Sequence, residues 1–431
     1  MNLIESRRAT NQNRGWYFVA ILPGAWAIFG SRWGSYLPKE PFFFSDLLIC
    51  LLVASTILSN VLVKRRNKFN LYLFFSFYLV FELLMSDWVQ PITSLRDFLP
   101  YFYLTVAPLM AIRFISAEDA MLARFGILLQ VCIVLHTFWC VASFFIPQIT
   151  LSLPIVSAAQ SLHIFSIRPD FDAVITSVFI AMVILNRINI IPRKIQYLLV
   201  LVGSAYIILQ NNRASFISFV LLILLASRSR IKLVENIDLK GLLKIAGFSM
   251  ATISIVIISQ LSIGQKFIGT INADSTNASA QAGAGTASAR LSAWKLVFDF
   301  IDAKPQRLAF GTGFGNDYLQ DSGALRALVN SEEGSRTSPR HPHNYWINSY
   351  ARLGLVGIAT LLLLFSQGLR RSFRVFKNHS SYGDATLISA LIFISIIPVA
   401  SLGVVLESPF GAISMSMSLA FMLAVAEKEK A

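Results

Sequence analysis

The sequence predicts an all-α polytopic membrane protein, and three observations carry that prediction. The 431 residues are 55% hydrophobic and only 14% charged, with a mean hydropathy of +0.62, which is unusual for a soluble protein. Apolar runs of about 16–22 residues recur to the end of the chain, and such runs are long enough to cross a bilayer as helices. The sequence does not show the ten-residue alternation of a membrane β-barrel.

About twelve membrane spans are predicted, and one large polar segment interrupts them. Nine runs precede that segment: Trp16–Gly30, Phe43–Val63, Phe69–Met85, Phe98–Ile115, Phe125–Ile146, Ala173–Ile188, Ile195–Gln210, Ala214–Ser227 and Leu242–Ile263. Three runs follow it: Trp346–Phe365, Ala385–Leu406 and Ala412–Ala426. The predicted organisation is therefore 1–263 with nine spans, a large loop over 264–345, and 346–431 with three spans.

The Lys and Arg residues of the short loops predict the orientation, because cytoplasmic loops carry an excess of them. The basic side holds Arg7, Arg8, Arg14, the run Lys64–Lys68, Arg187, Arg193, Lys194, Arg228, Arg230, Lys232, Arg370, Arg371, Arg374 and Lys377. The opposite short loops hold little beyond Arg32, Lys39, Arg96, Arg168 and Arg213. Both termini are thus predicted to be cytoplasmic, and the large loop is predicted to face the opposite side, which in a bacterium is the periplasm or the cell exterior. The formal charge of +14 then reflects topology rather than nucleic-acid binding.

The large loop has two predicted parts. The stretch Asn272–Ser288 is rich in Ala, Gly, Ser and Thr, which have little to bury, so we expect it to be mobile. From Arg290 onward, apolar residues recur at helical spacing and predict an amphipathic helix that ends at Lys304-Pro305. Those residues are Leu291, Trp294, Val297, Phe298 and Ile301. A glycine-rich turn, Gly311–Gly315, follows, and it should let the backbone approach a ligand or a helix closely.

A histidine motif joins the large loop to the tenth span. It reads Arg340-His341-Pro342-His343-Asn344-Tyr345. Proline suits the first turn of a helix, so we expect His343 to lie in that turn beside unpaired backbone N–H groups. The helix dipole would keep its imidazole neutral and would attract an anion such as phosphate. The alternative is a histidine that merely caps the helix at the membrane interface.

Three arginines on the predicted periplasmic side suggest a site for a diphosphate. Arg213 interrupts two apolar runs, Arg290 begins the amphipathic helix, and Arg168 precedes the sixth span. A permanent cation at a membrane boundary is costly without a partner or a purpose, although it can also snorkel to the interface. Guanidinium groups match phosphate oxygens in a fork-shaped geometry, so these three arginines could clamp a diphosphate.

The sequence gives little support for metal or nucleotide chemistry. His341 and His343 could touch a metal, but no second cluster of His, Cys or acidic residues has the required spacing. Asp170, Asp172, Glu332 and Glu333 are interpreted as solvated loop charges, and Cys50, Cys132 and Cys140 as small buried hydrophobic residues. The sequence has no Walker motif. We therefore expect no cofactor.

These motifs together resemble those of the O-antigen ligase and O-antigen polymerase superfamily. The four matching features are the arginine turn Asn212-Arg213-Ala-Ser, the Arg-to-Trp motif Ser288–Trp294, the element Phe310–Gly315, and His343-Asn344-Tyr345 followed by Leu353–Gly357. They occur in the family's order. The first two hundred residues match only in hydropathy, so Arg168 has the weakest support.

The resemblance implies a GT-C-like glycosyltransferase of the bacterial inner membrane whose active site faces the periplasm. Its donor would be a glycan on undecaprenyl diphosphate, used without ATP or a metal ion and with inversion at the anomeric carbon. Arg213 and Arg290 would stabilise the departing diphosphate, and His343 would act as general base. The candidate substrate contacts are Arg168, Arg340, His341, Asn344, Tyr345, Trp294 and Gly313. For Trp294, Tyr345 and Trp346, interfacial anchoring is favoured over stacking on sugars.

Three activities remain open at this point. A ligase would pass the glycan to lipid A-core, and the single large loop with one catalytic set slightly favours it. A polymerase would pass the glycan to another lipid-linked repeat unit of O-antigen, capsule or exopolysaccharide. A transporter or flippase is less favoured, because transporters usually show matching halves and this sequence shows none.

Overall fold

The computed structural model describes residues 3–39, 42–58, 69–86, 88, 90–157, 162–210, 212–233, 278–329 and 342–429. The first helices are α1 (Leu3–Ser35), α2 (Phe44–Leu58), α3 (Asn70–Met85), α4 (Pro91–Thr105), α5 (Ala107–Ser116), α6 (Asp119–Phe145), α7 (Pro147–Leu151), α8 (Pro169–Ile184), α9 (Arg193–Leu209) and α10 (Arg213–Leu233). Then come α13 (Ala278–Asp302), α14 (Pro305–Phe310), α15 (Tyr318–Asp321), α16 (Ala324–Val329), α17 (Tyr345–Lys377), η3 (His379–Ser381), α18 (Asp384–Leu402), η4 (Val405–Glu407) and α19 (Pro409–Lys428).

Strands contribute little to the described fold. β1 (Pro38–Lys39) pairs antiparallel with β2 (Phe42–Phe43), and β3 (Ile155–Ser157) pairs antiparallel with β4 (Leu162–His163). Each pair forms its own two-stranded sheet. The helices therefore carry the architecture, as the sequence predicts.

Five helical segments among the described residues are long and apolar enough to cross a membrane. They are Pro91–Ser116, which joins α4 to α5, and α6, α17, α18 and α19. In α2 and in α3 the apolar stretch is shorter. These segments confirm the all-α polytopic membrane class. The count of twelve spans and the orientation stay predictions, and both the ninth span and the basic run Lys64–Lys68 lie outside the described residues.

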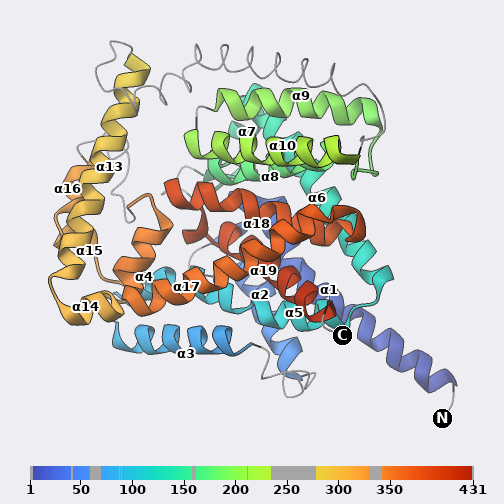
Figure 1. Ribbon diagram of the computed structural model, residues 1–431, viewed down its shortest axis with the longest axis horizontal. Coiled ribbons are helices and arrows are strands. Elements are labelled where there is room, and N and C mark those ends of the chain that lie inside the picture. The colour runs from blue at the N-terminus through green and yellow to red at the C-terminus, as the bar shows by residue number, and fades with distance from the viewer. Residues whose placement is uncertain are drawn as a thin grey trace.

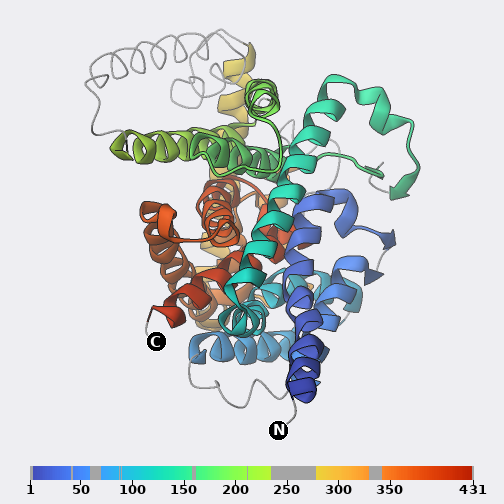
Figure 2. The same cartoon turned by 90° about the vertical axis from the view of Figure 1, so that its right-hand side faces the viewer.

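The fourth predicted span is divided in the structure. α4 ends at Thr105 and α5 begins at Ala107, with Val106 as the shared turn residue. Pro108 explains the division, because proline lacks the N–H that would continue the helical ladder. The division leaves this span as two short helical segments, which Figure 2 shows within the bundle from the side.

The buried core of the bundle centres on α8, α18 and α19. α8 packs against α6, α9, α10 and α18, and every residue from Phe171 to Val183 is buried. The layer of α9 and α10 lies over α18, and α19 lies against α1, α5 and α18 (Figure 1). α8 is enclosed on all its faces, and its buried residues other than Asp172, Thr176 and Ser177 are apolar, as expected of a fully buried helix.

α13 to α16 form a smaller second core beside the bundle (Figure 1). Ala293, Val297 and Ile301 of α13 are fully buried there and pack with residues of α15, α16 and α17. The predicted amphipathic helix is confirmed, but its apolar face is rotated, because Leu291 is 61% and Phe298 is 41% exposed.

The prediction of a mobile segment over Asn272–Ser288 is wrong from Ala278 onward. α13 begins at Ala278 and continues without interruption to Asp302. The physical reason is the alanine content of this stretch, since alanine has the highest helix propensity and offsets the cost of the glycines.

Candidate functional site

The connection between α18 and α19, which we call the α18–α19 turn (residues 401–410), collects several of the predicted residues. Arg168 Nη1 donates a hydrogen bond to Ser408 Oγ at 3.0 Å, and its guanidinium lies 5.1 Å from the centre of the Phe410 ring. Arg290 Nη1 donates to the carbonyl oxygen of Leu402 at 3.1 Å. The turn thus brings together two arginines that are 122 positions apart in the chain.

Arg213 begins α10 next to the start of α8. The Asn212 side chain accepts a hydrogen bond from Ser215 N at 3.2 Å, as helix-capping residues do. Ser215 Oγ in turn donates to the carbonyl oxygen of Pro169 at 3.1 Å. The arginine turn therefore adjoins Arg168, and the three predicted arginines come from segments that meet at one end of α8 and α18.

The histidine motif enters the same region through α17. Trp346 Nε1 donates to Ser401 Oγ at 2.9 Å, and Trp294 Nε1 donates to the carbonyl oxygen of Pro342 at 2.7 Å. Arg290 lies one helical turn before Trp294 on α13. The residue spacing from Arg290 to Trp294 thus allows one helix to contact both the α18–α19 turn and the histidine motif.

The predicted position of His343 in the first helical turn is wrong. α17 begins at Tyr345, and Asn344 is its N-cap: its side chain accepts from Trp346 N at 3.0 Å and from Ile347 N at 3.2 Å. Asn344 caps the helix with its side chain, so the helix starts at Tyr345, three residues later than a first-position Pro342 would set it. His343 precedes the cap in a left-handed conformation, with φ of 54°.

That backbone conformation is uncommon for a residue other than glycine. Such conformations persist only where the surrounding structure holds them, and they cluster at functional sites. The hydrogen bond from Trp294 to the carbonyl of Pro342 holds one side of His343, and the Asn344 cap holds the other. Arg340 and His341, the first two residues of the motif, lie outside the described residues.

The glycine-rich turn packs against a bend in α17 and confirms the predicted close approach to a helix. Gly354 interrupts the helical geometry with φ of 59°, and a Cβ there would lie 2.4 Å from the carbonyl oxygen of Ala309. A Cβ on Gly311 would lie 2.3 Å from the carbonyl carbon of Arg352. Gly313 donates its N–H to Arg352 O at 3.0 Å. Gly313 therefore serves the packing of this bend.

Tyr345 is fully buried, which argues against the interfacial anchoring favoured for it, whereas its contact with a substrate stays a prediction. Its ring stacks on Tyr101 with centroids 5.8 Å apart, and it also contacts the rings of Trp346 and Phe365. An aromatic residue whose ring packs on the interior of the bundle does not anchor a helix at the membrane interface. Sequence alone misplaced it because an aromatic residue at the predicted start of a span is also typical of an interfacial anchor.

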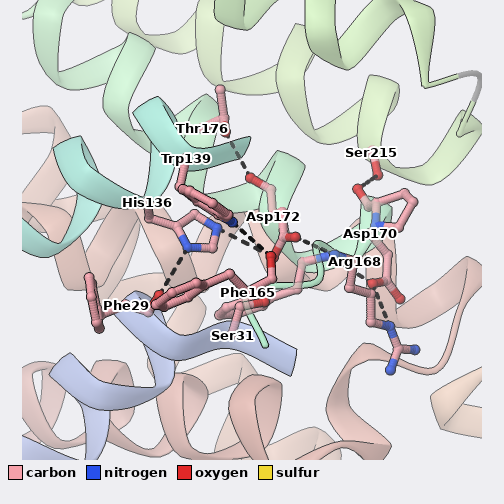
Figure 3. Close-up of polar contacts among 12 residues, drawn as sticks. Phe29, Ser31, His136, Trp139, Phe165, Arg168, Asp170, Asp172, Thr176 and Ser215 are labelled. Carbon is pink, nitrogen blue, oxygen red and sulfur yellow. Dashed lines mark hydrogen bonds and ion pairs between the residues drawn. The ribbon is translucent and has the colours of Figure 1, made fainter. Parts of the chain in front are cut away.

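Asp172 lies at the centre of a buried polar network that the sequence analysis missed (Figure 3). Its carboxylate accepts hydrogen bonds from Ser31 Oγ and from the backbone N–H of Arg168, and Oδ1 lies 3.3 Å from His136 Nε2. Asp170 forms an ion pair with Arg168 at 2.8 Å. The interpretation of Asp170 and Asp172 as solvated charges is therefore wrong, because Asp172 is fully buried and the Asp170 side chain is only 13% exposed. Glu332 and Glu333 lie outside the described residues.

The network also joins α1 to this region. Ser31 has φ of 45° and marks a kink in α1. Arg32 follows the kink and lies within electrostatic range of Arg168, Asp170 and Asp172. Arg32 thus adds a fourth arginine to the region that the sequence analysis had counted only for topology. Its signal in the sequence is weak, since it falls at the end of a predicted span.

His136, Cys140 and Asp172 place three possible metal-ligating atoms within 4.8 Å of one another, all on buried side chains. His136 and Cys140 are one turn apart on α6, and Asp172 comes from α8. Sequence spacing alone could not pair Asp172 with them, because the pairing depends on how α6 packs against α8.

A second buried polar network lies beneath the start of α17. Arg352 and Asp97 form an ion pair at 2.9 Å, and the side chain of each is 2% exposed. Tyr318 donates to Asn348 Oδ1 at 2.6 Å, and Asn348 Nδ2 donates to Tyr101 Oη at 3.3 Å. Paired charges and satisfied amides of this kind rigidify a core, so this network fixes the N-terminal half of α17.

Glu407 of η4 belongs to this second network. Its two carboxyl oxygens are buried, and burial raises the pKa of Glu407 to about 8 from 4.5. The charges of Arg352 and Arg168 and a hydrogen bond with Asn348 act in the opposite direction. A carboxylate with a pKa near neutrality in a site is a candidate for proton transfer. Its position between two apolar runs is the signal that sequence reasoning did not use.

Replacing Glu407 with glutamine should raise stability at alkaline pH. Because the pKa of Glu407 is raised in the folded state, the folded protein favours the protonated carboxyl group. The contribution of this group to the free energy of unfolding is fully present below pH 4.5 and is lost as the pH rises through about 8. Glutamine cannot ionise, so the melting temperature of Glu407→Gln should rise relative to that of the wild type as the pH increases from about 5 to about 8, by a few degrees in total. Thermal unfolding of the purified protein across this range measures the difference.

Glu429→Gln is the matched control. The pKa of Glu429 is lowered by its hydrogen bond with Tyr382, with a further contribution from Arg374, so its substitution has the opposite sign. A Glu407→Gln variant that loses stability toward alkaline pH would contradict the assignment.

The fold and this site define a helical integral membrane protein with an arginine-rich polar centre where several helix ends meet. Residues 198–362 match the family model described as O-antigen ligase. That stretch contains Arg213, Arg290, Gly313 and His343, so the match confirms the resemblance drawn from these motifs. It indicates a glycosyltransferase-like membrane enzyme. No curated protein matches the chain.

Proposed function

We propose that this protein is an O-antigen ligase. It transfers a glycan from undecaprenyl diphosphate to lipid A-core on the periplasmic side of the inner membrane. The observation that carries the proposal is the convergence of Arg168 and Arg290 on the α18–α19 turn, beside the segment that holds His343. The match to the O-antigen ligase model over the same stretch supports the reaction class.

The reaction is a single displacement at the anomeric carbon. A hydroxyl oxygen of the acceptor sugar forms the new bond, while the bond from the anomeric carbon to the diphosphate oxygen breaks and leaves its electron pair on the diphosphate. Arg290 and Arg213 stabilise the negative charge that develops on the leaving group. The proton of the acceptor hydroxyl passes to the imidazole of His343. One displacement inverts the anomeric configuration.

Glu407 is the second candidate for the proton acceptor. It lies on the α18–α19 turn itself, within electrostatic range of Arg168, and its pKa of about 8 suits a base at neutral pH. If His343 is the base, the activity of Glu407→Gln retains the pH dependence of the imidazole. If Glu407 is the base, the activity of Glu407→Gln no longer increases as the pH is raised toward 8.

Reconstitution with both acceptors tests the proposal. The purified full chain in proteoliposomes receives an undecaprenyl-diphosphate-linked glycan with either lipid A-core or a second lipid-linked repeat unit. We expect the glycan to appear on lipid A-core, as measured by product sizing. A ladder on the polyprenyl carrier would instead identify a polymerase, and no product with either acceptor would overturn the glycosyltransferase proposal.

The same assay should proceed with neither ATP nor an added divalent cation. The bond energy resides in the lipid diphosphate, and arginines supply the positive charge that a metal ion would otherwise provide. The cluster of His136, Cys140 and Asp172 makes this prediction worth a direct test. We expect EDTA treatment to leave the turnover of the wild type and of His136→Ala unchanged. A loss of activity that one added metal ion restores would contradict the arginine mechanism.

A further inference from the structure

An apolar groove of about 460 Å³ is lined in part by α3. α3 lies at the edge of the bundle (Figure 1). Its walls come from α2, α3, α4 and α5, and include Val53, Ser76, Val80, Phe102 and Leu109. Val80 is 48% exposed, so the groove opens on the outside of the bundle. Its volume falls in the range of about 300–1,000 Å³ that is typical of small-molecule sites.

A small polar pocket of about 80 Å³ adjoins this groove. The two cavities share Phe69 and Tyr72, at the start of α3. On its other side the polar pocket is lined by Gln367 and Arg371 of α17 and by Glu427 of α19. One cavity therefore presents a guanidinium, a carboxylate and an amide at the mouth of an apolar groove.

This pair of cavities is remote from the site described above. Arg371 lies near the C-terminal end of α17, whereas the site uses its N-terminal end. Glu427 likewise lies near the end of α19 opposite to Ser408. The groove and its polar pocket thus sit at the other ends of the same two helices.

We propose that the polar pocket and the groove bind one phospholipid whose headgroup carries both a phosphate and a primary ammonium. The phosphate accepts hydrogen bonds from Arg371, because a guanidinium matches phosphate oxygens in a fork-shaped geometry. The ammonium donates to the carboxylate of Glu427, and an acyl chain occupies the apolar groove. The proposal is independent of the transfer reaction.

The positive charge of Arg371 and the negative charge of Glu427 together select the class of lipid headgroup. An anionic headgroup without an amine satisfies Arg371 but places its negative charge beside Glu427. A choline headgroup carries its positive charge without an N–H donor, so it cannot form the charge-assisted hydrogen bond to the carboxylate. An ethanolamine headgroup offers a phosphate to Arg371 and an ammonium to Glu427.

Native mass spectrometry of the detergent-purified full chain tests this inference. The protein is titrated with phosphatidylethanolamine, phosphatidylglycerol and phosphatidylcholine of identical acyl chains. We expect one molecule of phosphatidylethanolamine to be retained about tenfold more tightly than either of the others, as one charge-assisted hydrogen bond would provide. Equal retention of the three lipids, or no retained lipid, would overturn the proposal.

Three variants and one control separate the contributions. Arg371→Gln should weaken phosphatidylethanolamine about tenfold, and Glu427→Gln should abolish the preference over phosphatidylglycerol. Val80→Trp fills the groove without touching either charge and should weaken all three lipids. The control is Arg374→Gln, because Arg374 bonds Glu429 at 2.7 Å and lines neither cavity.

The control must leave the preference for phosphatidylethanolamine unchanged. If Arg374→Gln acts like Arg371→Gln, bulk charge rather than the pocket holds the lipid, and the proposal fails. A preference that survives Glu427→Gln would equally overturn it. Monodisperse elution of each variant shows that the helices still pack, so lost retention then reports the cavity.

Discussion

His343→Ala should abolish glycan transfer while donor binding survives. The arginines hold the diphosphate, whereas the proposed task of His343 is to take the proton of the acceptor hydroxyl. General-base catalysis is worth about 10²–10⁴ in rate, so the residual activity should be small and should rise with pH, as hydroxide replaces the missing base. Single-turnover transfer, measured beside a donor-binding assay, separates the two steps.

His341→Ala is the matched control for that experiment. It stands on the other side of Pro342 in the sequence, so we expect a milder effect on transfer. An inactive His341→Ala with an active His343→Ala would show that the wrong histidine has been assigned. If both variants transfer normally, the motif only caps α17 at the interface, and Glu407 becomes the leading candidate for the base.

Arg290→Ala should lower turnover by about 10²–10³, which corresponds to the loss of one charge-assisted contact in a water-poor site. Arg213→Ala should show a loss of similar size. Unlike His343→Ala, both variants should also weaken donor binding, because the arginines contact the diphosphate before the reaction as well as during it. Turnover and donor affinity of the purified variants, measured together, test this pattern.

Arg326→Ala provides a control for charge alone. Arg326 belongs to α16, beside the same second core, and none of the predicted motifs includes it. We expect it to leave turnover within about twofold of the wild type. An equal loss in Arg326→Ala and Arg290→Ala would mean that the positive charge of the loop, rather than a positioned guanidinium, supports transfer.

The local parts of this fold could be predicted from sequence, because they depend on residues close together in the chain. Apolar runs located the helices, and the helical spacing from Arg290 onward located the second half of α13. The glycine-rich turn Gly311–Gly315 predicted a close approach of the backbone to a helix, and the structure confirms it. The sequence predicts the start of α17 a few residues too early, because Pro342 indicates a helix start there in place of the stronger cap Asn344.

The long-range parts could not be predicted, because they depend on how helices pack. From the sequence, Asp172 is interpreted as a loop carboxylate. In the structure, α1 and α6 place Ser31 and His136 against it. Glu407 is separated by 55 residues from Arg352, and only the return of the chain through α18 places them in one network. Buried polar partners carry no periodicity, so a single sequence gives no signal for the pairing.

The bend of α17 at Gly354 has a mechanical consequence. The nine residues from Tyr345 to Leu353 are anchored by the Asp97–Arg352 ion pair and by the glycine-rich turn, whereas the remainder of the helix continues along the bundle. A long span adapts to bilayers of different hydrophobic thickness by tilting. Because the two arms of α17 meet at a bend rather than forming one rod, the direction of the inner arm, which carries Asn344 and His343 toward the α18–α19 turn, is set by these contacts rather than by the tilt of the outer arm.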